Sequence, residues 1–317
     1  MRVIGSDDEV IDEVMEKLKE QFEMVEKKTE KLKFLNIRIK IKQDGIELSQ
    51  AEYVDRILEN FGLKECNPAK TPLDSQTDLN ESKNSEPANK LEYQSMLGSL
   101  MYLSTATRPD ISYAVSKLSQ FSNDPRKIHV TAAKRVFRYL KGTSDYSLKY
   151  SRESEDLRIS TDASWNSEKG ARSYSGYDVR LGQAVIGWKS RKQELVALST
   201  CEAEIIAICE GVRELKWISG LLNSLGMEEY TKPPIVINSD STSAINWIQR
   251  NNITNRTKHI ERKYYFVRDE LKKGSIRLSH VSSEDMEADF VTKSLNTIKH
   301  GRNVELLGLV DVNYIST

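Results

Sequence analysis

Four acidic residues, each in a different segment of the chain, have the chemical character of metal ligands. Asp162 stands at the end of a predicted strand in STDASW, Glu204 lies in STCEAE, Asp240 in INSDS and Asp289 in MEADFVTK. Carboxylates at strand ends and helix starts can converge to hold two divalent ions about 4 Å apart. One ion then activates water and the other stabilises the leaving oxygen, which is the chemistry of phosphodiester hydrolysis. By itself the spacing supports only a weak metal-site hypothesis.

Each acid also has a structural explanation, because the chain contains 47 Asp and Glu residues. Asp240 could cap a helix over residues 243–250, and Glu204 could lie near a helix N-terminus because of the helix dipole. Asp289 could be a solvated helix residue. Whether these acids are metal ligands or structural residues therefore depends on the helices and strands that carry them.

The sequence pattern of the N-terminal part predicts a helix, a hairpin, a second helix and a linker, in that order. Ser6 has the sequence context of a helix N-cap, and the alternation over residues 35–48 predicts a β-hairpin. Ser49 repeats the capping pattern before a helix expected from about residue 50 to 61. The polar segment 73–90 predicts a linker.

A helical module is expected next, followed by a region of short strands. The helices are expected over residues 91–105, 109–121 and 126–141. The strands are expected over residues 157–161, 173–181 and 184–189.

A long helix is expected from Cys201 to about Leu225, after which the pattern is strand, helix, helix, strand, helix. Ser199 is its expected N-cap with Glu202 as the capping partner, and Gly211 in its middle predicts a close backbone contact. Three antiparallel strands followed by helix-linked strands predict a mixed α/β sheet.

Composition narrows the function classes. With 38% apolar and 30% charged residues, the chain has the composition of an ordinary soluble protein, and no basic, apolar leader opens it, so a cytoplasmic or nuclear location and no membrane partner are expected. The three cysteines form no CxxC pair, so no structural zinc site is expected. Because the formal net charge is zero, nucleic-acid binding would depend on local basic patches.

Several long motifs resemble one family. The segments VALSTCEAEIIAI, NRTKHIERKYYFVRDEL and EADFVTKSL closely resemble the ribonuclease H domain of copia-type retrotransposon polyproteins, in the family's order. Upstream, LGSLMYLSTATRPDISYAVSKLSQF and RVFRYLKGTSDYSLKY resemble the segment that joins polymerase to ribonuclease H. KFLNIRIKIKQDGIELSQAEYVDRILENFGL is similar to the last part of the polymerase. Nearly the whole chain is covered.

The resemblance implies the fold and its division. It implies an α/β fold: an RNase H-like mixed five-stranded sheet with flanking helices, preceded by a small α+β and helical remnant of the reverse transcriptase palm, thumb and connection. The implied parts are a palm remnant at 1–72, a linker at 73–90, a thumb or connection segment at 91–150, the RNase H domain at 151–300 and a tail at 301–317.

The resemblance also implies an Asp-Glu-Asp-Asp site. It falls on Asp162, Glu204, Asp240 and Asp289, and Glu204 is preferred to Glu202 because the small apolar pair of EIIAI follows it. The site would bind two Mg²⁺ ions, with Mn²⁺ as an alternative, and cut RNA endonucleolytically in RNA/DNA hybrids.

The polymerase aspartates of the family are expected before Met1, so the chain is expected to be a C-terminal piece without polymerase activity. One rival interpretation is an inert retroelement relic or domesticated fragment that binds nucleic acid or a polymerase partner. Another is a DNA exonuclease or junction resolvase that uses metals in the same way.

Candidate contacts to an RNA/DNA hybrid surround the acids, and the rest of a reverse transcriptase is a second expected partner. Short hydroxyl donors and an aromatic ring next to the acids are suited to the sugar-phosphate. These are Ser164, Trp165, Ser241 and Thr242. Basic residues on two predicted helices could bind phosphates, although a solvated helix face is the commoner explanation of such a run. These are Lys134, Arg138, Lys141, His259, Arg262 and Lys263.

Overall fold

The computed structural model describes residues 8–23, 32–80, 85–151, 156–165, 172–250 and 260–311. The chain forms two compact units, Met1–Leu32 and Lys33–Thr317. In the first unit, helix α1 (Asp8–Gln21) occupies the predicted position, whereas its expected cap, Ser6, lies outside the described residues. The candidate site belongs entirely to the second unit.

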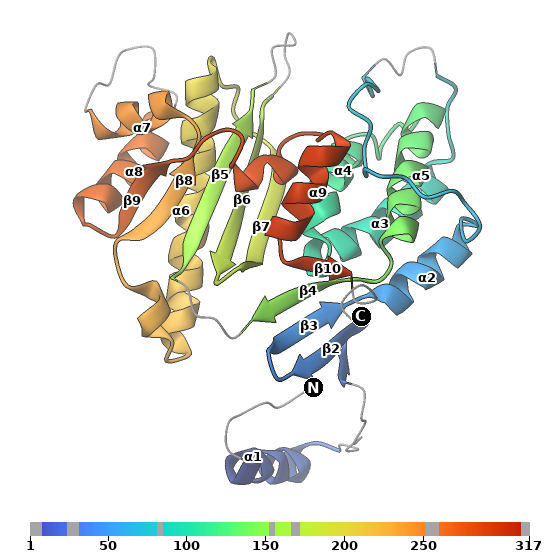
Figure 1. Cartoon of the computed structure of the whole chain (residues 1–317), viewed down its shortest axis with the longest axis horizontal. Coiled ribbons are helices and arrows are strands. Elements are labelled where there is room, and N and C mark those ends of the chain that lie inside the picture. The colour runs from blue at the N-terminus through green and yellow to red at the C-terminus, as the bar shows by residue number, and fades with distance from the viewer. Residues whose placement is uncertain are drawn as a thin grey trace. The chain divides into compact units, whose positions relative to one another are not determined.

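One sheet assembles segments from both ends of the chain (Figure 1). Its strands run in the order β1-β2-β3-β4-β10. The bounds are β1 (Leu32–Phe34), β2 (Ile37–Lys42), β3 (Gly45–Ser49), β4 (Tyr146–Ser151) and β10 (Leu309–Asp311). β2 and β3 form the predicted hairpin, and Gly45 has a φ of 152° with its Cα close to the backbone of Tyr150, where a side chain would clash. β10, in the segment expected to be a tail, pairs antiparallel with β4.

The predicted helices form a module with its own apolar core. The elements are α2 (Ala51–Asn60), α3 (Lys90–Ala106), the 3₁₀ turn η2 (Pro109–Ile111), α4 (Ser112–Ser119) and α5 (Lys127–Gly142). Tyr93, Leu100 and Phe137 are fully buried in that core. The expected cap of α2 was wrong: Gln50, not Ser49, is its N-cap, and the Ser49 hydroxyl accepts from the Ala51 N–H instead.

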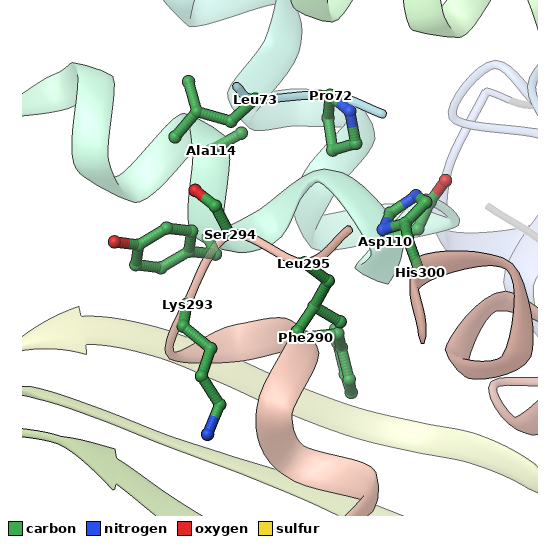
Figure 2. Close-up of a pocket in the computed structure, with 10 residues that line it drawn as sticks. Pro72, Leu73, Asp110, Ala114, Phe290, Lys293, Ser294, Leu295 and His300 are labelled. Carbon is green, nitrogen blue, oxygen red and sulfur yellow. The ribbon is translucent and has the colours of Figure 1, made fainter. Parts of the chain in front are cut away.

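A buried polar network ties this module to helix α9 (Thr297–Leu306). Arg108 is 2% exposed and pairs with Asp110 at 2.7 Å, and the Tyr139 hydroxyl donates to the same carboxylate at 2.7 Å. His300 Nε2 lies 2.9 Å from the Tyr139 hydroxyl oxygen. The Tyr139 hydroxyl already donates its proton to Asp110. We therefore assign the imidazole proton of His300 to Nε2, which donates to the Tyr139 oxygen. Figure 2 shows Asp110 and His300 side by side on one wall of a small pocket.

The second sheet has the topology expected of an RNase H-like fold. Its order is β7-β6-β5-β8-β9, with β5, β6 and β7 antiparallel and β5, β8 and β9 parallel. The strands are β5 (Arg158–Ser164), β6 (Tyr174–Leu181), β7 (Ala184–Lys192), β8 (Ile235–Ser239) and β9 (Ile276–His280). The helical elements are α6 (Thr200–Ser224), η3 (Glu228–Thr231), α7 (Thr242–Gln249), α8 (Glu261–Lys272), η5 (Glu287–Val291) and α9. The predicted mixed sheet is thus confirmed.

Two glycines let elements approach the strand that carries Asp162. A Cβ at Gly211 of α6 would lie 2.6 Å from Thr161 Cγ2, so this glycine allows the close contact predicted from its position. A Cβ at Gly176 of β6 would lie 2.4 Å from Val291 Cγ2. Gly176 pairs with Asp162 in the register of β5 and β6, so it admits η5 next to that acid.

No helix in the described part of the chain is long and apolar enough to cross a membrane.

Candidate metal centre

Three of the four predicted acids converge. Each of Asp162, Glu204 and Asp240 offers a carboxylate oxygen, and these oxygens lie within 4.8 Å of one another. Asp162 lies in the C-terminal half of β5 and Asp240 directly follows β8, so the parallel pairing of these strands brings both acids to one edge of the sheet. Glu204 lies in the first turns of α6, whose close packing on β5 brings it there as well.

The structure decides between the two explanations of Asp240. The N-cap of α7 is Ser241, whose hydroxyl accepts from the Ala244 N–H at 3.2 Å. Asp240 is therefore not the helix cap. One of its oxygens, Oδ2, accepts from the Ser283 hydroxyl at 2.8 Å, which fixes the carboxylate toward the other two acids.

Burial makes this cluster electrostatically costly without a cation. Asp162 is 2% exposed, and its burial, opposed by Lys293 and reinforced by the charges of Asp289 and Asp240, raises its pKa to about 6. Burial, followed by the charge of Asp162, raises the pKa of Glu204 well above its ordinary value.

The unpaired oxygen of Glu204 fits a divalent metal. Its Oε1 accepts from the Ala163 N–H at 3.2 Å, whereas Oε2 is buried without a hydrogen-bond partner among the described residues. A buried, unpartnered carboxylate oxygen is destabilising unless it binds a cation. An all-oxygen donor set suits Mg²⁺ or Mn²⁺.

The fourth acid, Asp289, lies in η5 and is fully buried rather than solvated. It is not among the acids whose oxygens converge within 4.8 Å. Instead, each of its oxygens faces an ammonium: Oδ1 lies 2.6 Å from Lys293 Nζ, and Oδ2 pairs with Lys299. Lys293 Nζ is also 3.6 Å from Asp162 Oδ2, so the same lysine connects the fourth acid to the cluster.

Sequence reasoning missed four residues around the acids. The Thr292 hydroxyl donates to Asp162, Ser283 orients Asp240, and Lys293 and Lys299 pair with Asp289. A local signal existed for Lys293, because a lysine four residues after an acid can pair with it. No local sequence pattern could have identified Ser283 or Lys299. Ser283 contacts Asp240, which is distant in the sequence, and Lys299 contacts Asp289, which lies on another element.

The hydroxyl and aromatic candidates beside the acids are placed differently from one another. Trp165 is 41% exposed, and its indole Nε1 donates to the Ala197 carbonyl at 3.4 Å. Ser164 and Trp165 line one side of a pocket that the segment 73–80 and α4 complete. Thr242 is exposed, whereas the Ser241 hydroxyl already serves as the α7 cap.

The basic candidates form two separate surfaces, on α5 and on α8, which lie on opposite sides of the RNase H-like sheet in Figure 1. On α5, Lys134 is exposed and Lys141 half-buried, but Arg138 Nε donates to the Asn67 carbonyl at 2.7 Å. On α8, Arg262 is exposed and Lys263 half-buried. His259 lies outside the described residues.

The chain is similar in sequence to known reverse transcriptase and Pol polyprotein sequences. Residues 1–75 match the family model described as reverse transcriptase (RNA-dependent DNA polymerase). The Pol polyprotein of transposon RE1 from Arabidopsis thaliana is 35% identical over 297 residues, 93% of this chain and 20% of that protein. The polyprotein of transposon RE2 from the same plant is 34% identical over 98% of this chain and 21% of its own length.

Among solved structures, the foamy viral protease-reverse transcriptase in complex with RNA/DNA hybrid is 12% identical with a TM-score of 0.48, over 89% of this chain and 34% of that one. The chain spans about a fifth of the length of the two plant polyproteins. From sequence similarity over nearly its whole length, the chain belongs to the family of copia-type retrotransposon Pol polyproteins.

Proposed function

We propose that the chain is a ribonuclease H, which hydrolyses the RNA strand of RNA/DNA hybrids with two divalent metal ions, Mg²⁺ or Mn²⁺. The observation that carries the proposal is the convergence of Asp162, Glu204 and Asp240 within 4.8 Å, from three separate elements, beside the buried Asp289. Membership of a retroelement polyprotein family supports it, because reverse transcription creates such hybrids.

Each acid has a defined task in this proposal. Asp162, Glu204 and Asp240 would hold the ions, with Asp289 completing the set. When bound, the ions supply an activated water and positive charge at the leaving oxygen. The chain itself keeps the donor oxygens in place: Thr292 and Ser283 each donate a hydrogen bond to one carboxylate.

The substrate would be recognised next to this centre. Trp165 and Thr242 are exposed close to the acids in the sequence, where an aromatic face and a hydroxyl can contact a sugar-phosphate. The RNA/DNA hybrid and the remaining part of a reverse transcriptase are the proposed partners.

The test is a cleavage assay with a labelled RNA/DNA hybrid, with Mg²⁺ and with chelator. We expect metal-dependent cuts in the RNA strand, lost in Asp162→Asn and Asp240→Asn. Asp124→Asn, an exposed aspartate of the helical module, is the matched control and should cleave as wild type does.

Other results would identify the rival functions. Hybrid binding without any cleavage would indicate an inert, nucleic-acid-binding relic. Cleavage of DNA strands instead of RNA would indicate an exonuclease or resolvase.

A further inference from the structure

The two lysines that face Asp289 are held in different ways. Lys299 pairs with Asp289 Oδ2 and also donates to the Ser283 carbonyl at 2.9 Å, and the Ser283 hydroxyl donates to Asp240. Lys299 therefore belongs to a chain of contacts that connects two of the acids through the backbone. It is anchored by a neutral carbonyl as well as by charge.

Lys293 is held by charge. Among the described residues, the close partners of its ammonium are carboxylates of the candidate metal site: Asp289 Oδ1 at 2.6 Å and Asp162 Oδ2 at 3.6 Å. Its charge also opposes the rise that burial causes in the pKa of Glu204, and, against the effect of its own burial, the charges of Asp162, Asp289 and Asp240 raise the pKa of Lys293. All four acids thus interact with this one cation.

The Lys293 side chain is also partly exposed to solvent. Its side chain is 39% exposed, whereas the side chain of Asp289 is fully buried and that of Asp162 is 3% exposed. Figure 2 shows its ammonium end directed toward the sheet and away from Pro72 and Leu73, which line the small pocket beside it. The ammonium can leave the acids without unpacking the core.

An ammonium and a divalent metal compete for these oxygens. The same buried carboxylates attract both cations. The two cations also repel each other when both lie beside the same pair of carboxylates. An ammonium has three donors and no acceptor, so it can satisfy carboxylates but cannot ligate a metal. A metal bound through Asp162 and Asp289 therefore requires Lys293 to move.

We propose that Lys293 is an exchangeable internal cation: it neutralises the acids in the metal-free protein and gives up its contacts to Asp162 and Asp289 when metal binds. Lys299, by contrast, is a fixed positioning residue for Asp289. The proposal rests on the proposed function, because it presumes that the four acids are the metal site.

The experiment is calorimetric titration of the full chain with Mn²⁺, without nucleic acid. Lys293→Gln removes the competing charge, and we expect it to bind Mn²⁺ about fivefold or more tightly than wild type, because the metal no longer has to displace an ammonium from carboxylates about 4 Å away. Lys293→Arg keeps the charge and should bind no more tightly than wild type. Lys232→Gln, an exposed lysine at the opposite end of β8 from Asp240, should leave the affinity unchanged.

Thermal melting gives a second readout that does not involve activity. In chelator, Lys293→Gln should melt below wild type, because its acids lack their counter-ion, and saturating Mn²⁺ should raise its Tm by more than it raises that of wild type. Lys293→Arg should follow wild type in both conditions.

The outcomes separate the inference from the proposed function. Equal or weaker Mn²⁺ binding by a folded Lys293→Gln variant, with saturable binding by wild type, would overturn the inference alone. Tighter binding by Lys293→Arg as well would also overturn it, because the charge would then not be the competitor. Absence of saturable binding in wild type would overturn the proposed function together with the inference.

Discussion

At the residue scale, the two glutamates of CEAE illustrate how similar side chains two positions apart acquire different roles. Glu202 Oε2 accepts from the Leu198 N–H at 2.8 Å, while the Glu202 N–H donates to the Ser199 hydroxyl at 3.2 Å. Glu202 thus stabilises the N-terminus of α6 by capping hydrogen bonds. Glu204 instead points its carboxylate at β5, with one oxygen unpartnered among the described residues.

The first prediction separates these roles. Glu202→Gln should lower the free energy of unfolding by about 1 kcal/mol or less, because an amide oxygen can still accept the capping hydrogen bond. Glu204→Gln should abolish hybrid cleavage, because it removes a charged donor oxygen. Urea unfolding and single-turnover cleavage of both variants check this. Cleavage by Glu204→Gln at the wild-type rate would show that Glu204 is not a ligand.

At the scale of elements, the position of η5 depends on a buried ion-pair cluster. Arg180 on β6 is 1% exposed, and its Nε lies 2.7 Å from Asp178 Oδ2 and 3.0 Å from Glu287 Oε2. The same guanidinium also donates to the Leu306 carbonyl at the end of α9. Because Glu287 opens η5, this cluster holds the segment that carries Asp289.

The second prediction concerns Arg180. Arg180→Met should lower the free energy of unfolding by about 3 kcal/mol or more, since it leaves two acids without their buried counter-charge. Arg191→Met on β7 is the matched control: that arginine is 32% exposed and pairs with Glu194 and Glu210, so the loss should be about 1 kcal/mol or less. If urea unfolding shows similar losses of unfolding free energy in both variants, the buried ion-pair cluster stabilises the fold no more than an exposed ion pair does.

The third prediction concerns the contact between α9 and the helical module. Burial lowers the pKa of His300, so the folded protein holds the neutral imidazole whereas the unfolded chain takes up a proton below its ordinary value of 6.5. The stabilising contribution is therefore present above about pH 6.5 and is lost as the pH falls below it.

Urea unfolding at several values between about pH 7.5 and 5.5 tests this, because the range brackets the ordinary histidine pKa. His300→Gln should lose stability less steeply on acidification than wild type, since glutamine can donate to Tyr139 but does not titrate. Parallel curves for the two proteins would exclude His300 as the source of the pH dependence.

At the scale of the whole molecule, the helical module and the RNase H-like sheet belong to the same compact unit, Lys33–Thr317. A core cluster that includes Leu148 of β4, Val185 of β7 and Leu309 of β10 connects the two sheets. Residues of α5 could therefore act on a substrate that the acids bind, provided that their side chains are free. Arg138 is not free, because it holds the Asn67 carbonyl.

The fourth prediction follows from this difference along α5. Replacing Lys134 and Lys141 together by Gln should weaken hybrid binding and flatten its salt dependence by about one counterion per lost phosphate contact. The cleavage rate at saturating hybrid should stay near wild type, because these contacts would bind substrate and transition state alike.

Arg138→Gln serves as the comparison on the same helix. It should lower the free energy of unfolding by about 1 kcal/mol through the lost hydrogen bond, with little change in the salt slope. An unchanged slope in the double lysine variant would assign α5 a solvated surface and leave Arg262 and Lys263 of α8 as the remaining basic candidates.

The sequence alone determined the elements and the identity of the acids. Apolar periodicity, caps and glycines predicted the helices and most of the strands, because these signals act between residues a few positions apart, but β1, β4 and β10 were not predicted. The family motifs then selected Asp162, Glu204, Asp240 and Asp289 from 47 acidic residues, and the structure brings the first three together.

Only the tertiary structure decided how these acids are supported. The Lys299–Ser283–Asp240 contacts and the pairing of β4 with β10 join residues far apart along the chain, and the use of Arg138 as an anchor depends on a loop 71 residues away. Such contacts arise from packing of whole elements, and local patterns carry no information about them. Lys293 shows the limit most clearly: its spacing from Asp289 suggests an ordinary helical ion pair, and only the approach of β5 turns it into a cation shared with Asp162.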